Sequence, residues 1–162
     1  MRELIDVLHV GIAMLFVAGL IGRSAAFSRA RRAQSIQTVE SLLQLSDWFE
    51  RSLVIPMYVG VLITGPLVAW IGGWPLAAGL QTGAPKWPLV ALILFLSPIL
   101  AIATYLIPRR KARLRALADA VARKQVTPEL AAALSDRGVR LIRQGELVMT
   151  GVVMVLMVAK PF

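Results

Sequence analysis

Residues 8–20 are Leu-His-Val-Gly-Ile-Ala-Met-Leu-Phe-Val-Ala-Gly-Leu, and this stretch decides how the rest of the chain is interpreted. It is the centre of an apolar segment, residues 4–27, with Asp6 and Arg23 close to its two ends. A helix of this length and polarity can cross the ~30 Å hydrocarbon layer of a bilayer. The segment is therefore a predicted membrane span, and it carries the only histidine of the chain, His9, near its start.

The composition of the whole chain is typical of a membrane protein. Of its 162 residues, 57% are hydrophobic and 17% are charged, and residues 52–85 and 87–108 contain no charged side chain. A soluble domain of this length carries more charge and interrupts its apolar runs sooner. We expect an all-α fold, a bundle of four transmembrane helices that forms one domain over residues 1–162. The expected spans are at about residues 4–27, 52–73, 87–107 and 141–159.

Two polar segments connect these spans on one side of the membrane. Residues 28–51 carry apolar side chains at helical spacing, which predicts an interfacial helix or a helical extension of the second span. Residues 109–140 predict a helical hairpin, because Thr127 followed by Pro128 is typical of a helix start. We expect the hairpin to pack through two sets of side chains, Leu114, Leu117 and Val121 against Leu130, Leu134 and Val139.

The positions of the basic residues predict the orientation. Fifteen of the 18 Lys and Arg residues lie in the connectors 23–51 and 108–143, and only Arg2, Lys86 and Lys160 lie on the other side. Basic connectors stay in the cytoplasm during membrane insertion. We therefore expect a basic cytoplasmic hairpin between spans three and four, and both termini outside the cytoplasm.

The composition also excludes several classes of function. The chain has no cysteine, which excludes disulfides, thiolate metal sites, iron–sulfur clusters and thiol catalysis within it. It has no P-loop, no nucleophile-elbow motif and no second histidine for a zinc motif. The formal charge of +9 does not predict nucleic-acid binding, because the basic residues lie beside membrane spans, where lipid and topology explain them.

Two ionisable residues within the spans are candidates for function. An imidazole in an apolar helix is costly without a partner, so His9 is either a functional ligand or a headgroup-level histidine that bonds to a neighbouring helix or to water. Glu146 is either a catalytic carboxylate or, as we favour, the ion-pair partner of Arg143 three residues earlier. The topology allows His9 to share a site with Lys86, whereas it places Glu146 near the opposite membrane face.

Several segments resemble a known family. Residues 8–10 and 16–20, Leu-His-Val and Phe-Val-Ala-Gly-Leu, resemble the first helix of HemJ-type protoporphyrinogen IX oxidases, which has a Leu-His pair and an aromatic-x-Ala-Gly-Leu segment at the same spacing. Residues 158–162 resemble their Val-Val-Lys-Pro-Phe ending, and Lys86 is similar in placement to their functional lysine. The wider kinship includes CopD-type copper-resistance membrane proteins and an uncharacterised group of small four-helix membrane proteins.

This resemblance implies a cofactor and a location. It implies a haem b whose iron is bound by His9, with Lys86 as a catalytic and cofactor-binding residue near the porphyrin, in a protein of the bacterial inner membrane. A neutral imidazole is a common axial ligand of haem iron, and an ammonium can pair with a propionate. The family has Trp where Phe16 and Thr82 stand here, and these departures bear on the oxidase activity more than on haem binding.

A single histidine limits the ligand set, because one chain cannot supply two imidazoles to one haem. A sixth ligand would come from His9 of a second copy or from a methionine, with Met154 and Met157 at the matching depth. The alternative is an iron with one open face. Three functions follow: a haem-binding redox protein that could oxidise protoporphyrinogen IX, a non-enzymatic subunit of a homo-oligomer or larger membrane complex, and, least favoured, copper handling.

Overall fold

The computed structural model describes residues 2–74, 76–81, 83 and 85–160, and every regular element among them is helical. Four helices in this part of the chain are long and apolar enough to cross a membrane, which confirms the predicted all-α fold with four spans. The α-helices are α1 (Arg2–Ala30), α2 (Ile36–Phe49), α3 (Ile55–Ile71), α4 (Trp87–Leu96), α5 (Pro98–Ala101), α6 (Ile107–Ala122), α7 (Pro128–Leu134) and α8 (Arg137–Ala159). Three further helical segments are η1 (Glu50–Val54), η2 (Leu76–Leu80) and η3 (Ile102–Leu106).

The second and third long helices each contain a π-helical segment, and proline explains both. Segment η1 ends two residues before Pro56, and η3 ends two residues before Pro108. A proline inside a helix lacks an N–H, and its ring clashes with the carbonyl four residues earlier, which belongs to Ser52 in η1 and to Thr104 in η3. The helix widens at these points instead of breaking. The third long helix is also interrupted at Ser97, between the end of α4 and Pro98, which begins α5.

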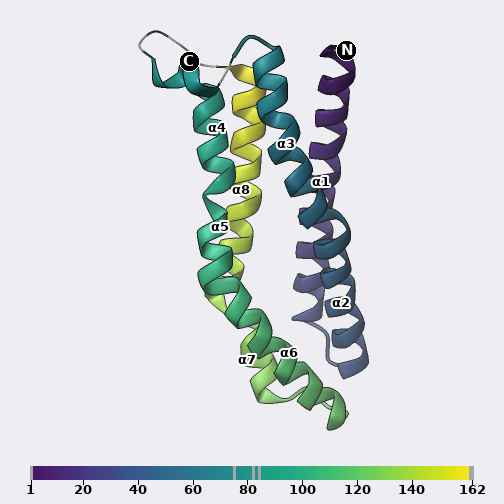
Figure 1. The fold of residues 1–162 in the computed structure, drawn as a ribbon. Coiled ribbons are helices and arrows are strands. Elements are labelled where there is room, and N and C mark those ends of the chain that lie inside the picture. Colours follow the sequence, from purple (N-terminus) through teal and green to yellow (C-terminus); the bar gives the residue numbers. More distant parts are fainter. Residues whose placement is uncertain (1, 75, 82, 84, 161–162) are drawn as a thin grey trace.

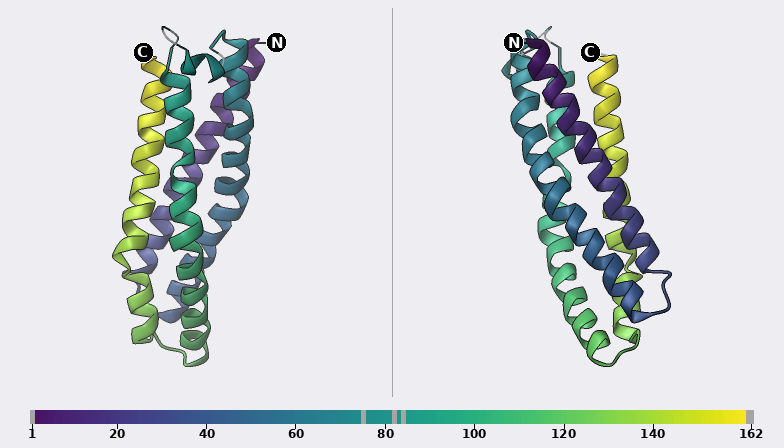
Figure 2. Two further views of the ribbon diagram at one scale, coloured as in Figure 1. Left: turned by 60° about the vertical axis from the view of Figure 1, so that its left-hand side comes forward. Right: turned by 90° about the vertical axis from the view of Figure 1, so that its right-hand side faces the viewer.

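The spans are arranged as two helix pairs. Helix α1 packs along α2, η1 and α3, and helix α4 packs along α8. The pairs meet where α1 contacts α8 and where α2 contacts α6. The two ends of the chain and the connection from α3 to α4 lie at one end of the bundle, and the α1–α2 and α6–α7 connections lie at the other (Figures 1 and 2). We call these the terminal end and the basic end.

Large apolar side chains cover the outside of the bundle. Ile63, Ile93 and Val155 are 65%, 58% and 65% exposed. In the most apolar stretch of each span, no more than 22% of the residues are buried inside the protein. An apolar surface of this extent is stable only against lipid or against other membrane helices, so its exposure is what the predicted spans require.

The basic end has its own apolar core, which includes the predicted hairpin. Thr127 begins α7 as expected, because its hydroxyl accepts a hydrogen bond from the backbone N–H of Leu130. The predicted packing is wrong in part, since Leu114 and Val121 are 43% and 37% exposed and Ala120 is the buried apolar residue of this helix. The cause is that α6 faces both α7 and the α1–α2 hairpin. This core contains Phe27, Ala30, Ile36, Val39, Leu43, Ala120, Leu130, Leu134 and Val139.

Candidate functional site

His9 lies on the second turn of α1 and is 7% exposed, although most of the apolar residues around it on this helix face outward. Its Nδ1 is 2.7 Å from the hydroxyl oxygen of Thr64 on α3. The same hydroxyl lies 2.7 Å from the backbone carbonyl oxygen of Gly60. Gly65 packs beside the ring, where an added Cβ would lie 3.5 Å from Cε1 of His9, an ordinary van der Waals contact.

This chain of hydrogen bonds determines the tautomer of the histidine. A carbonyl oxygen can only accept, so Thr64 donates its hydroxyl proton to Gly60 and accepts a proton from Nδ1 of His9. The ring is therefore the Nδ1–H tautomer, and Nε2 keeps its lone pair. No hydrogen bond to Nε2 forms within the described part of the chain. A hydrogen bond from the other ring nitrogen, such as this one to Thr64, is how proteins orient a histidine that ligates a metal.

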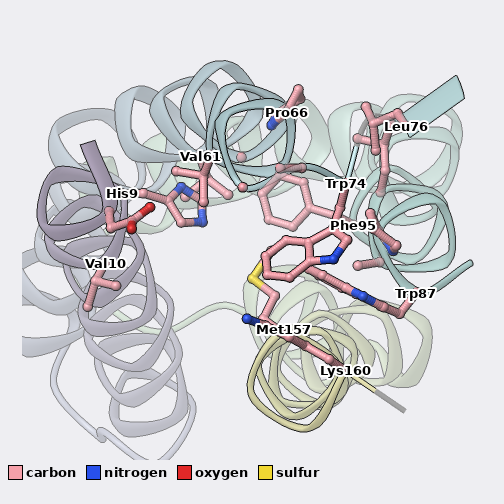
Figure 3. A pocket seen from close by; sticks show the side chains of 18 of the residues that line it. His9, Val10, Val61, Pro66, Trp74, Leu76, Trp87, Phe95, Met157 and Lys160 are labelled. Carbon is pink, nitrogen blue, oxygen red and sulfur yellow. The ribbon is translucent and has the colours of Figure 1, made fainter. Parts of the chain in front are cut away.

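The His9 ring faces a cavity of about 320 Å³ at the terminal end, between the two helix pairs. Figure 3 shows the ring directed from α1 into the space in front of Phe95 and Met157. The walls are almost wholly apolar and come from α1, α3, α4 and α8. Three charged residues line its outer part, namely Arg2, Asp6 and Lys160. The cavity thus combines apolar walls, one imidazole nitrogen and a charged rim.

Two lysines that the sequence placed on this side have different positions. The ammonium of Lys160 lies over the rings of Trp74 and Trp87, 4.2 and 6.0 Å from their centroids, and the residue lines the cavity. Lys86 is exposed immediately before α4 and is not among the residues that line the cavity. The structure therefore brings His9 and Lys160 to one cavity and leaves Lys86 outside it.

A methionine thioether, whose sulfur can bind a metal, also lines the cavity. Met157 lines it from α8, whereas Met154 is 46% exposed on the same helix. Within the described residues there is no cluster of three His, Asp or Glu side chains that could hold a metal ion. An imidazole with one thioether is a poor cage for a bare metal ion, but it is an axial ligand pair known for haem iron.

A buried ion network lies at the opposite depth, toward the basic end. Arg23 on α1 is 2% exposed and reaches Glu50 in η1 at 2.8 Å and Glu146 on α8 at 2.5 Å. The preferred sequence interpretation, an ion pair between Glu146 and Arg143, is wrong. Glu146 faces α1, and the guanidinium of Arg143 lies instead over the ring of Phe27, 4.3 Å from its centroid. This network, the Arg23 cluster, joins the two helix pairs.

Three aromatic rings separate the two depths of the bundle. Tyr58 stacks on Phe95 with centroids 4.5 Å apart, and Phe16 lies 5.9 and 5.7 Å from these two rings. The Tyr58 hydroxyl donates a hydrogen bond to the Phe95 carbonyl oxygen, which fixes the α3–α4 contact. Phe95 lines the His9 cavity on one side and a second cavity on the other.

Comparison with known proteins gives a family for the chain. Residues 3–161 match the model of the predicted integral membrane proteins DUF2269. The chain belongs to this family. No curated protein and no solved structure matches it. The likeness of this DUF2269 protein to HemJ-type oxidases therefore rests on the quoted residues alone, of which Pro161 and Phe162, like Thr82, lie outside the described residues.

Sequence reasoning missed two components of the site in this DUF2269 protein. Thr64 is the acceptor that orients His9, and its signal was a single threonine within the apolar stretch of residues 52–73. Lys160 was expected at the same end of the bundle as His9, where the structure places it, but it was given no role. The pair of His9 and Thr64 depends on the register between α1 and α3, which no local pattern reveals.

Proposed function

We propose that this DUF2269 protein is a haem b-binding redox protein of the membrane, in which Nε2 of His9 binds the haem iron. The observation that carries the proposal is the chain from His9 through Thr64 to Gly60, which leaves Nε2 unprotonated beside an apolar cavity. A histidine that only forms hydrogen bonds at headgroup level does not need an unprotonated nitrogen directed at an apolar cavity. The bare nitrogen is what a metalloporphyrin requires.

The other residues of the cavity are compatible with haem b. Met157 would supply a sixth ligand, and Arg2 and Lys160 would pair with the two propionates at the rim. The cavity volume of about 320 Å³ falls in the lower part of the range of small-molecule pockets, which suits a ligand that is only partly enclosed. When bound, haem supplies a one-electron couple whose potential depends on its axial ligands and on the polarity around it.

Lys86 retains a separate proposed role. It is exposed immediately before the first residue of α4, the buried Trp87, so it can bind a substrate that arrives from the membrane surface. We propose that its ammonium pairs with a carboxylate of an acidic porphyrin substrate such as protoporphyrinogen IX and positions it for oxidation. This role concerns turnover, whereas the role of His9 concerns cofactor binding.

A visible spectrum tests the cofactor proposal. The purified protein, supplied with haem b in detergent, is expected to acquire a Soret band that His9→Ala abolishes. Leu8→Ala is the matched control, because Leu8 is the preceding residue of α1 and is 53% exposed. A Soret band of equal intensity in His9→Ala, or no band in the wild-type protein, would rule out His9 as the iron ligand.

The second candidate function is that of a non-enzymatic subunit that packs against further membrane helices. What favours it is a set of glycines with nothing within 4 Å of an added Cβ, which include Gly11 on α1 and Gly151 on α8. Small residues on a lipid-facing surface allow close helix association. Stable co-purification with other subunits, without a chromophore and without any effect of His9→Ala, would favour this function over haem binding.

The proposed location is the bacterial plasma membrane, with both termini outside the cytoplasm. Because the chain has no cysteine, a single introduced cysteine reports its own position. A membrane-impermeant maleimide applied to whole cells is expected to label Gln81→Cys, in the connection from α3 to α4, and to leave Gln125→Cys in the α6–α7 turn unlabelled. Both positions are exposed, so the opposite pattern would reverse the orientation.

A further inference from the structure

The second cavity, about 330 Å³, lies between the helix pairs on the side of the basic end. Toward the middle of the membrane its walls are apolar, and they include Tyr58, Phe95, Ile99 and Ile102. Toward the basic end it is lined by arginines from three helices and by three acidic side chains. These charged residues are Arg23, Arg109, Arg110, Arg113, Arg143, Asp47, Glu50 and Glu146.

The acidic side chains of this cavity already have partners. Glu50 and Glu146 both accept from Arg23. Asp47 accepts from Arg110 at 3.0 Å and lies 3.9 Å from Arg113. The lining therefore contains five positive and three negative side chains, and the carboxylates are held by arginines. An anion would meet an excess of positive charge here.

Arg143 is the cation that this arrangement leaves without an acid. In the described part of the chain no carboxylate lies within ion-pair distance of it, and its Nε and Nη1 are buried with no hydrogen-bond partner. Its charge lies over the Phe27 ring at 4.3 Å, and the guanidinium of Arg113 lies over the same ring at 5.0 Å. Buried donors of a charged group are costly when unbonded, so an anionic acceptor at Arg143, beside Arg113, would stabilise this arrangement.

We infer that this cavity binds an anionic glycerophospholipid from the leaflet at the basic end, with its phosphate at Arg143 and Arg113 and one acyl chain along the apolar wall. Basic pockets between membrane helices are the usual binding sites of anionic headgroups. A free phosphate would account for the cations but not for the apolar wall that continues from them beside Ile99 and Ile102. A lipid accounts for both, and the site is independent of haem at His9.

Native mass spectrometry of the delipidated protein tests the site directly. Phosphatidylglycerol is expected to bind about tenfold more tightly than phosphatidylcholine of the same acyl chains. Arg143→Gln is expected to remove this preference, and Arg140→Gln is expected to keep it. Arg140 is a matched control because it lies three residues earlier on α8, is exposed and does not line the cavity.

A second variant blocks the proposed acyl-chain wall and leaves the charges in place. Ile102→Trp is expected to weaken phosphatidylglycerol binding by a similar factor, and this result stands even if Arg143→Gln fails to fold. Inorganic phosphate at the same concentration is expected not to compete with the lipid. The inference is overturned if the two lipids bind equally, if Arg140→Gln loses as much preference as Arg143→Gln, or if inorganic phosphate displaces the lipid, which would indicate a small-anion site.

Discussion

The two depths of this bundle place polar groups in apolar surroundings in opposite ways. Near the terminal end, His9 is bonded on one side by Thr64 and faces a cavity with its other nitrogen. Near the basic end, Arg23 is held by two carboxylates from two other helical elements. The first arrangement leaves a ligand atom available, and the second joins the helix pairs. The comparison separates ion pairs that join the helix pairs near the basic end from the proposed binding site at the terminal end, where one nitrogen is left without a partner among the described residues.

The largest expected effect on stability comes from the Arg23 cluster, near the basic end. Arg23→Ala leaves the buried carboxylate of Glu146 and the half-buried carboxylate of Glu50 without their shared partner, and breaking a buried pair costs about 3–5 kcal/mol. We expect a large fall in the thermal unfolding midpoint of the protein in detergent. Arg29→Ala, at an exposed position on the same helix, is expected to change the unfolding free energy by about 0.5 kcal/mol or less. Equal effects of the two changes would show that the Arg23 cluster does not hold the pairs together.

The next effect concerns the contact between α1 and η1 that positions both regions. A Cβ at Gly19 would lie 2.8 Å from the Cβ of Leu53 and 3.3 Å from the backbone nitrogen of Val54. Gly19→Ala is therefore expected to lower the unfolding free energy by about 1–3 kcal/mol, as overpacking does. Gly11→Ala on the same helix meets nothing within 4 Å and serves as the control. Both variants are measured by thermal unfolding, and a neutral Gly19→Ala would contradict the close packing.

A third substitution acts only on the proposed haem site at the terminal end. Thr64→Val keeps the shape of the side chain but removes the acceptor that orients His9, and loss of a hydrogen-bond partner of a ligating histidine weakens metal binding by about 10–100-fold. Haem titration followed at the Soret band measures this. Thr104→Val is the control, because Thr104 is exposed and makes the same kind of bond, to the carbonyl oxygen of Leu100. Unchanged affinity in Thr64→Val would mean that the hydrogen bond does not prepare the site.

The smallest effect separates the two lysines. Lys160→Ala removes a charge at the cavity rim and is expected to weaken haem binding about 2–5-fold, the size typical of a partly exposed ion pair. Lys86→Ala is expected to leave the affinity nearly unchanged and to lower turnover of an acidic porphyrin. Parallel titration and activity assays distinguish these outcomes. A loss of affinity in Lys86→Ala alone would place this lysine, and not Lys160, beside the porphyrin.

The fold was largely predictable because the bilayer limits the solutions. Runs of ~20 apolar residues must cross the membrane as helices, because a single segment in lipid can form all of its backbone hydrogen bonds only within a helix. The hairpin was predictable from the local start signal at Thr127. The packing of Leu114 and Val121 was not, because it depends on the α1–α2 hairpin, which is distant in sequence.

The site was predictable in His9 and in Met157, one of the two methionines expected at the matching depth. His9 could be singled out because an imidazole in an apolar helix requires an explanation. Its partner Thr64 is 55 positions away, and the choice between Lys86 and Lys160 depends on how the α3–α4 connection and the end of α8 are folded. The predicted pairing of Glu146 with Arg143 failed for the same reason, since Glu146 pairs with Arg23 on a helix distant in sequence and Arg143 lies over Phe27.

Nitrogen NMR of the single histidine tests the central claim most directly. With ¹⁵N-labelled histidine, the protein gives one pair of ring signals, because His9 is the only histidine in the chain. We predict that Nδ1 carries the proton at neutral pH and Nε2 does not, and that a diamagnetic metalloporphyrin shifts the Nε2 signal far more than the Nδ1 signal. A proton on Nε2, or an Nε2 signal that the metalloporphyrin leaves unmoved, would contradict the account.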